Sequence, residues 1–140
     1  MDIEIRLALE HLNAHFCYFL DHDQVDQLIN LFTEDAAYSH GSRKSFGHEE
    51  IRQVFSARTS GGPRTARHMQ TGLRLRLLDD THAEGESVCM TFAEDALPPI
   101  TPANPLLVAD FVDRYRRDTD GRWRIEKRHI ERIFVAEGNT

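Results

Sequence analysis

The chain changes its hydrophobic period once, at Gly61-Gly62-Pro63, and this change constrains the fold more than any other feature. Before this turn, apolar residues such as Ile5, Leu9, Leu12 and Phe16 recur at the spacing of an amphipathic helix. After it, apolar and polar residues alternate with period two, which is the period of half-buried strands. Helices first and long strands afterwards indicate an α+β fold.

The periodicity predicts the following elements along the chain. Helices are expected at about residues 3–20 and 24–32, with a third helix after Phe46-Gly47 that carries Ile51, Val54, Phe55 and Arg58 on successive turns. A short strand is expected at 36–40, and long strands at about 65–78, 82–94, 106–117 and 122–135, the last one opened by Trp123. Three helices would cover one face of a strongly curved, mostly antiparallel sheet, in one domain over residues 1–140.

Composition and charge narrow the range of partners. A net charge of −6 argues against nucleic acid, because such binding depends on a basic surface. No apolar run reaches the roughly 20 residues that span a bilayer, and the N-terminus lacks the pattern of a signal peptide. We therefore expect a soluble, cytoplasmic protein without membrane contact. Cys17 and Cys89 lie in apolar-periodic segments, so we expect buried, reduced thiols.

One histidine and one aspartate are the strongest catalytic candidates. His68 lies where a predicted strand leaves a loop, a position at which scaffolds often present reactive groups. Asp21 lies at the end of the first helical segment, and an acid there could meet His68 as an Asp–His pair. The alternative is structural: Asp21 caps the second helix and His68 merely pairs with it. Asp23 could replace Asp21 if the helix ends later.

Several segments resemble the SnoaL-like family of the nuclear transport factor 2-like superfamily, whose members fold as α+β cones of the cystatin-like type. The resemblance covers nearly the whole chain and lies in segments 19–28, 31–36 and 46–51, in Arg67-His68, and in residues 115–123. It implies the cone described above. It also implies an assembly, a homodimer or homotrimer.

Within this family, scytalone dehydratase and hexachlorocyclohexane dehydrochlorinase look like the most useful comparisons. Asp21 falls on the family aspartate and His68 on the family histidine, and the pocket positions of the strand after the second helix fall on Tyr38 and His40. A further histidine of the dehydratase has no counterpart, and one of its pocket asparagines falls on Phe111. The resemblance implies a cofactor-free lyase or isomerase, dehydratase-like, that acts on a small hydrophobic ring or polyketide-like compound.

A substrate cavity would lie between the helices and the sheet. We expect it to be lined by Phe16, Phe19, Leu20, Tyr38, His40, Val54 and Phe111, with His129 added because it shares strand parity with Trp123 and Ile125. Whether Asp113 enters the cavity stays open. Strict parity places His68 on the opposite face from Leu73, and a bulge near Gly72 would reconcile the two.

Other functions remain possible on this scaffold. The chain could be a non-catalytic ligand-binding or dimerisation module, or the small subunit of an aromatic-ring dioxygenase. His11 and His15 lack the glutamate of a zinc-binding HExxH helix, so we expect no metal site. In an oligomer, the interface would carry arginines paired with acids, namely Arg74, Arg76, Arg114 and Arg116 with Glu84, Glu86 or Asp113.

Overall fold

The computed structural model describes residues 1–137, which form helices followed by long strands as predicted. The helices are α1 (Ile3–Asp21), α2 (Val25–Ile29) and α3 (Gly47–Ser56), and α3 continues into a short 3-10 helix, η1 (Ala57–Thr59). The strands are β1 (Phe32–His40), β2 (Arg43–Phe46), β3 (Thr65–Asp79), β4 (His82–Glu94), β5 (Leu107–Arg117) and β6 (Trp123–Val135).

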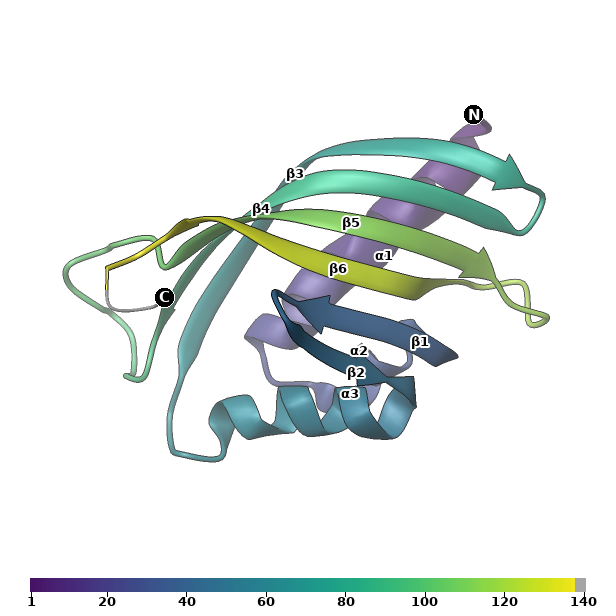
Figure 1. Ribbon diagram of the computed structural model, residues 1–140. Helices are drawn as coiled ribbons and strands as arrows, with labels where there is room; N and C mark the ends of the chain where they lie inside the picture. The colour runs from purple at the N-terminus through teal and green to yellow at the C-terminus, as the bar shows by residue number, and fades with distance from the viewer. Residues whose placement is uncertain (138–140) are drawn as a thin grey trace.

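The strands form one mixed, curled sheet in the order β2-β1-β6-β5-β4-β3. All neighbours are antiparallel except β1 and β6, which run parallel. Figure 1 shows α1 crossing one face of β3 to β6, while α2 and α3 lie beneath β1 and β2. The sheet curves over the helices without closing, so the α+β cone is confirmed. No helix among the described residues is long and apolar enough to span a membrane.

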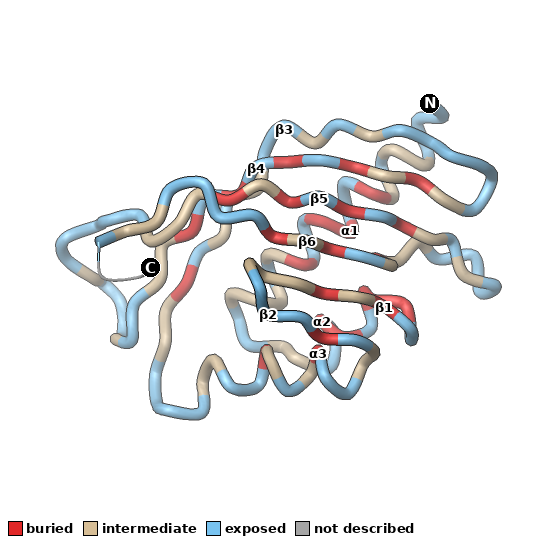
Figure 2. The backbone as a smooth tube through the Cα atoms, in the orientation of Figure 1, coloured by how far each residue is buried: buried red, intermediate tan, exposed pale blue. Residues whose placement is uncertain are grey.

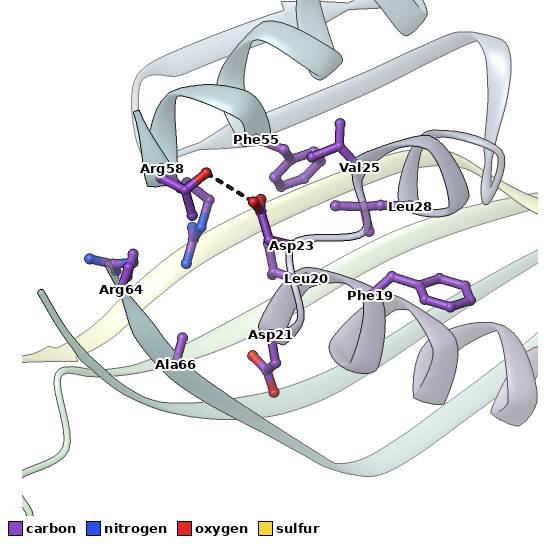
Figure 3. Close-up of a pocket in the computed structure, with 11 residues that line it drawn as sticks. Phe19, Leu20, Asp21, Asp23, Val25, Leu28, Phe55, Arg58, Arg64 and Ala66 are labelled. Carbon is purple, nitrogen blue, oxygen red and sulfur yellow. Dashed lines mark hydrogen bonds between the residues drawn. The ribbon is translucent and has the colours of Figure 1, made fainter. Parts of the chain in front are cut away.

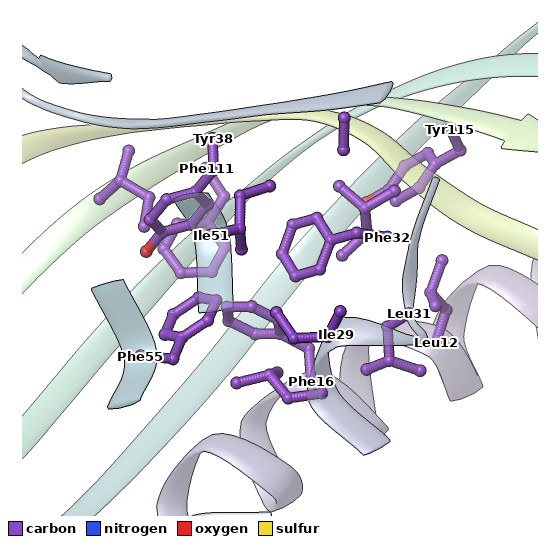
Figure 4. Close-up of a cluster of buried hydrophobic side chains, with 14 of the residues drawn as sticks. Leu12, Phe16, Ile29, Leu31, Phe32, Tyr38, Ile51, Phe55, Phe111 and Tyr115 are labelled. Atoms are coloured by element: carbon purple, nitrogen blue, oxygen red, sulfur yellow. The ribbon is translucent and has the colours of Figure 1, made fainter. Parts of the chain in front are cut away.

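The core lies between α1, α3 and the concave face of the sheet (Figure 4). Burial alternates along β4 and β5, because every second side chain points toward the helices (Figure 2). Phe16 of α1 is fully buried and meets the rings of Phe32, Phe55 and Phe111 edge to face. These aromatic side chains therefore pack against one another in the interior of the cone.

Two boundaries differ from the sequence prediction. The helix expected over 24–32 ends at Ile29, and β1 starts at Phe32 rather than at residue 36. Leu28, Ile29, Leu31 and Phe32 are all buried, and a continuous apolar run does not distinguish a helix from a buried strand. The short strand β2 was also missed, because its four residues are mostly polar and exposed.

A bulge in β3 explains the parity conflict at His68. The pairing of β3 with β4 shifts between Thr71 and Arg74, and Gly72 has a φ of 70°. The extra residue puts His68 on the same face as Leu73 and Leu75, the face that points toward α1. The bulge proposed near Gly72 is therefore confirmed, and it lets one strand present both a polar pair and core leucines.

Candidate active site

The end of α1 places Asp21 beside β3. The helix stops with Asp23 in the left-handed region at a φ of 54°, with backbone hydrogen bonds from Gln24 N to Phe19 O (2.9 Å) and from Asp23 N to Leu20 O (3.4 Å). This is the Schellman pattern, usually completed by glycine, and aspartate is one of the few residues that tolerate the same backbone geometry. Because α1 ends here, Asp21 is its last residue and lies against the edge of the sheet.

His68 meets Asp21 at that edge through two hydrogen bonds. The imidazole Nδ1 lies 2.6 Å from Asp21 Oδ1, and the backbone N–H of His68 donates to Asp21 Oδ2 at 3.0 Å. Both side chains are nearly enclosed, with 9% of His68 and 6% of Asp21 exposed. The backbone bond is available because β3 is the edge strand of the sheet and its outer N–H groups have no strand partner. The predicted contact between the two residues is thus present, and its catalytic role stays a prediction.

The pair lies between two hollows. On one side a groove of about 800 Å³ separates α1 from β3, and we call it the α1–β3 groove. His68, Gln70 and Leu73 line it from the strand, and Asn13 and Cys17 line it from the helix. On the other side lies a cavity of about 30 Å³, which we call the Asp21 cavity (Figure 3). The imidazole therefore has open space beside it, and no described residue hydrogen-bonds its Nε2.

Of the residues expected to line the substrate cavity, two border the Asp21 cavity and others belong to the core. Phe19 and Leu20 line the Asp21 cavity. Phe16, Tyr38 and Phe111 are buried in the core, at 0%, 6% and 3% exposure, and do not face an open space. Val54 packs at the border of the core, and its neighbour Phe55 lines the cavity instead. The helical pattern identified the inward face of α3 but not which side chain on it borders the hollow.

His40 and Asp23 take other positions. His40 ends β1 half-buried, and burial followed by the charges of Arg132, Arg58 and Arg43 lowers its pKa below the usual value. The carboxylate of Asp23 points away from His68 and accepts a hydrogen bond from Thr59 Oγ1 at 3.1 Å. Asp21 alone is therefore the acid that meets His68.

The prediction that His129 faces the cavity is wrong. Its Nδ1 lies 2.6 Å from Ser39 Oγ and its Nε2 lies 3.0 Å from Glu131 Oε2, on the face of the sheet opposite the helices. The pairing of β5 with β6 shifts at Glu126, which inserts one residue into β6 and reverses the parity beyond it. Arg128 faces the interior in its place.

Arg128 is the interior polar residue that the sequence analysis missed. It is fully buried and pairs with Asp113 through Nε and Nη2, both at 2.8 Å. Its guanidinium lies 4.4 Å from the Phe16 ring centre and 4.6 Å from that of Phe111. Burial lowers the pKa of Arg128, but the Asp113 carboxylate offsets this and leaves the pKa raised. The sequence left open whether Asp113 enters the interior. It lies inside the cone and balances the charge of Arg128.

A hydrogen-bond network connects the ion pair of Arg128 and Asp113 to the α1–β3 groove. Tyr115 donates to Asp113 at 2.7 Å, and Asn13 donates to Tyr115 at 3.0 Å. Arg128 also donates to Asn13, and Gln70 Nε2 donates to Asn13 Oδ1 at 3.0 Å. Asn13 and Gln70 thus fix the floor of the α1–β3 groove from the core side. Neither residue was singled out from sequence, because a lone amide in a periodic segment carries no signal.

The sequence predicts buried, reduced cysteines and no metal site. Cys17 and Cys89 are unpaired, with Cys89 buried and Cys17 partly exposed at the groove. A hydrogen bond with Cys89, together with burial, raises the pKa of the Cys17 thiol. Within residues 1–137, no three His, Cys, Asp or Glu side chains gather closely enough to ligate a metal ion.

Comparison with known proteins gives one family and many similar folds. The SnoaL-like domain family matches residues 1–129. A protein from Novosphingobium aromaticivorans with the provisional name scytalone dehydratase superposes with a TM-score of 0.84 at 19% identity, over 99% of this chain and 89% of that chain. A cystatin-like protein of unknown function from Nostoc punctiforme superposes with a TM-score of 0.76 at 24% identity, over 91% of this chain and 90% of that chain. Rv3472(D26N) from Mycobacterium tuberculosis, also of unknown function, superposes with a TM-score of 0.82 at 24% identity, over 98% of this chain and 76% of that chain. At these identities the superpositions show the fold alone. No curated protein sequence matches the chain.

Proposed function

Because the chain belongs to the SnoaL-like family, we propose that it is a cofactor-free lyase or isomerase of the dehydratase type. In this proposal His68 removes a proton from a small hydrophobic ring or polyketide-like compound, and Asp21 orients His68. The observation that carries the proposal is the 2.6 Å hydrogen bond between His68 Nδ1 and Asp21 Oδ1, which leaves Nε2 without a partner among residues 1–137.

The chemistry follows from the different roles of the two imidazole nitrogens, Nδ1 and Nε2. A carboxylate that accepts from Nδ1–H holds the proton there, so the lone pair lies on Nε2. That lone pair removes a proton alpha to a carbonyl or beta to a leaving group, and Asp21 stabilises the imidazolium that forms. The second bond, from the His68 backbone to Asp21 Oδ2, fixes the carboxylate itself. Proton return to another carbon gives isomerisation, return to the same carbon gives hydrogen exchange, and loss of the leaving group gives elimination.

The α1–β3 groove supplies a place for the substrate next to His68. Its volume of about 800 Å³ lies within the range of small-molecule sites. Ala14 and Leu73 provide apolar lining, and Asn13 and Gln70 provide polar groups that the buried network holds in place. The provisional name of the Novosphingobium structure, scytalone dehydratase, belongs to the same reaction class.

Hydrogen exchange tests the proposal without knowledge of the natural substrate. We expect the protein to catalyse exchange of the acidic ring protons of β-tetralone in deuterated buffer, followed by proton NMR. Replacing His68 by glutamine should reduce the rate by about 10² to 10⁴, the usual contribution of a general base. Asp21→Asn should cause a smaller loss, since that residue orients the base without accepting the substrate proton.

The matched control is His15→Gln, an exposed histidine of α1 that stacks on Phe19 and does not line the groove. It should leave the exchange rate unchanged. Equal rates for wild type and His68→Gln, at equal folded fraction by circular dichroism, would rule out His68 as the base.

A non-catalytic binding module is the second candidate, and the enclosure of His68 favours it, since only 9% of that side chain is exposed. Arg128, Phe16 and Phe111 fill the interior of the cone, so a ligand of such a module would also lie in the groove. If ring compounds bind in the groove but no hydrogen exchange occurs, this second function applies.

A further inference from the structure

The Asp21 cavity contains two cationic side chains beside an apolar wall (Figure 3). Arg58 reaches it from η1, at the end of α3, and Arg64 from the segment just before β3. The apolar wall consists of Phe19, Leu20, Val25, Leu28, Phe55 and Ala66. Two cations and two acids, Asp21 and Asp23, thus share a space that is otherwise mostly hydrophobic.

Neither guanidinium is fully paired. Within the described part of the chain, Arg58 has no hydrogen-bond or ion-pair partner, although it is partly buried. Arg64 donates through Nη1 to Asp95 at 3.1 Å, but its Nε is buried without a partner. Burial, followed by the charge of Arg64, lowers the pKa of Arg58. A guanidinium carries five N–H donors, and enclosing it without acceptors is costly.

The acids that line the same cavity already bond elsewhere. Both carboxylate oxygens of Asp21 accept from His68. Asp23 accepts from Thr59, shown by the dashed line in Figure 3. Asp21 and Asp23 act on Arg58 through charge at a distance, without direct contact. The donors of Arg58 and the Arg64 Nε therefore remain available to an acceptor that comes from outside the chain.

We propose that Arg58 and Arg64 bind a carboxylate group in the Asp21 cavity. A planar carboxylate matches the forked donors of arginine. The volume of about 30 Å³ is about twice the 10–15 Å³ that a single water needs, which leaves room for the two oxygens of a carboxylate. The carboxylate comes from one of two sources, a free small acid or the head group of a ring acid.

The ring-acid source rests on the proposed function and would define its substrate class. Ala66 borders the cavity and His68 follows two residues later on the same face of β3. Two strand residues span about 7 Å, so the cavity and the residue that carries the base lie about one ring length apart along β3. The substrate would then be a cyclic or aromatic acid.

Isothermal titration calorimetry of the full chain at constant ionic strength tests the site with three probes: sodium formate, sodium benzoate and benzamide, the neutral isostere of benzoate. We expect benzoate to bind about tenfold more tightly than benzamide, as expected for one charge-assisted contact. Arg58→Gln should remove this preference. Arg52→Gln should keep it, because Arg52 of α3 pairs with Asp26 outside the cavity. Arg64→Gln provides a second test should Arg58→Gln fail to fold.

The probes also separate the two sources. Tighter binding of benzoate than of formate supports a ring acid, and equal binding of both supports a free small acid. Loss of hydrogen exchange in His68→Gln and loss of the benzoate preference in Arg58→Gln are separate results, so the anion site survives even if the proposed base is wrong. Equal affinities of benzoate and benzamide for the wild type would overturn the site. Unchanged benzoate affinity in both arginine variants would do the same.

Discussion

At the scale of single residues, the buried pair of Arg128 and Asp113 is the contact on which the interior depends most. Both side chains have 0% exposure, and Asp113 is the only carboxylate that Arg128 contacts among the described residues. Removing one charge leaves the other buried without compensation. We expect Asp113→Asn to lower the free energy of unfolding by about 3–5 kcal/mol in urea titrations. The double variant Asp113→Leu/Arg128→Met should recover much of this loss, and a double variant as unstable as the single one would contradict the explanation.

His40 gives a pH-dependent contribution to stability. Burial lowers its pKa in the folded protein below the usual 6.5, so the unfolded chain binds a proton at a higher pH than the folded chain does. Stability is therefore kept above pH 6.5 and lost as the pH falls below that value. We expect His40→Gln to weaken the dependence of the melting temperature on pH in this window. Parallel melting curves for wild type and variant across the acidic range would show that His40 does not contribute.

At the scale of elements, the bulge of β3 determines whether His68 and the core leucines can share one face. Gly72 has a φ of 70°, and a side chain at this φ is strained although nothing lies within 4 Å of its Cβ position. We expect Gly72→Val to destabilise the protein by about 1–2 kcal/mol. Gly61→Val is the control, since Gly61 also has open space but no positive φ. Equal effects of both variants, measured by thermal unfolding, would refute the role of the bulge.

The same elements show what the sequence could predict and what it could not. Long strands with period two were predicted to within about two residues, because their alternation extends over many positions. The bulge at Gly72 was foreseen, because a glycine marked it. The bulge at Glu126 had no such mark, so His129 was placed inside and Arg128 was overlooked. Strand parity fails after a single inserted residue, and nothing local in the sequence reveals the insertion.

At the scale of the whole molecule, the outer face of the sheet predicts an oligomer. Met69, Met90, Val108 and Phe134 are register partners across four strands, and Phe134 is 70% exposed. Of the ion pairs expected at the interface, Arg76 pairs with Glu84. Arg116 pairs instead with Asp35, Asp118 and Glu126, and Asp113 is buried inside with Arg128. An apolar row edged by ion pairs suits an isologous contact with a second copy.

We expect a homodimer at micromolar concentration by light scattering, and Met90→Lys should shift it toward monomer. Leu97→Lys, on an exposed loop with 72% exposure, is the control that should keep the dimer. A monomeric wild type would contradict this assembly.

The central claim is that Asp21 holds the proton of His68 on Nδ1 and leaves Nε2 as the base. The most direct measurement is a long-range proton–nitrogen correlation NMR spectrum of the wild type at mildly alkaline pH, with the His68 signals assigned by their loss in His68→Gln. We predict a neutral imidazole whose Nδ1 carries the proton, consistent with the 2.6 Å contact to Asp21 Oδ1. A proton on Nε2 instead would show that no lone pair faces a substrate there, and would contradict the account.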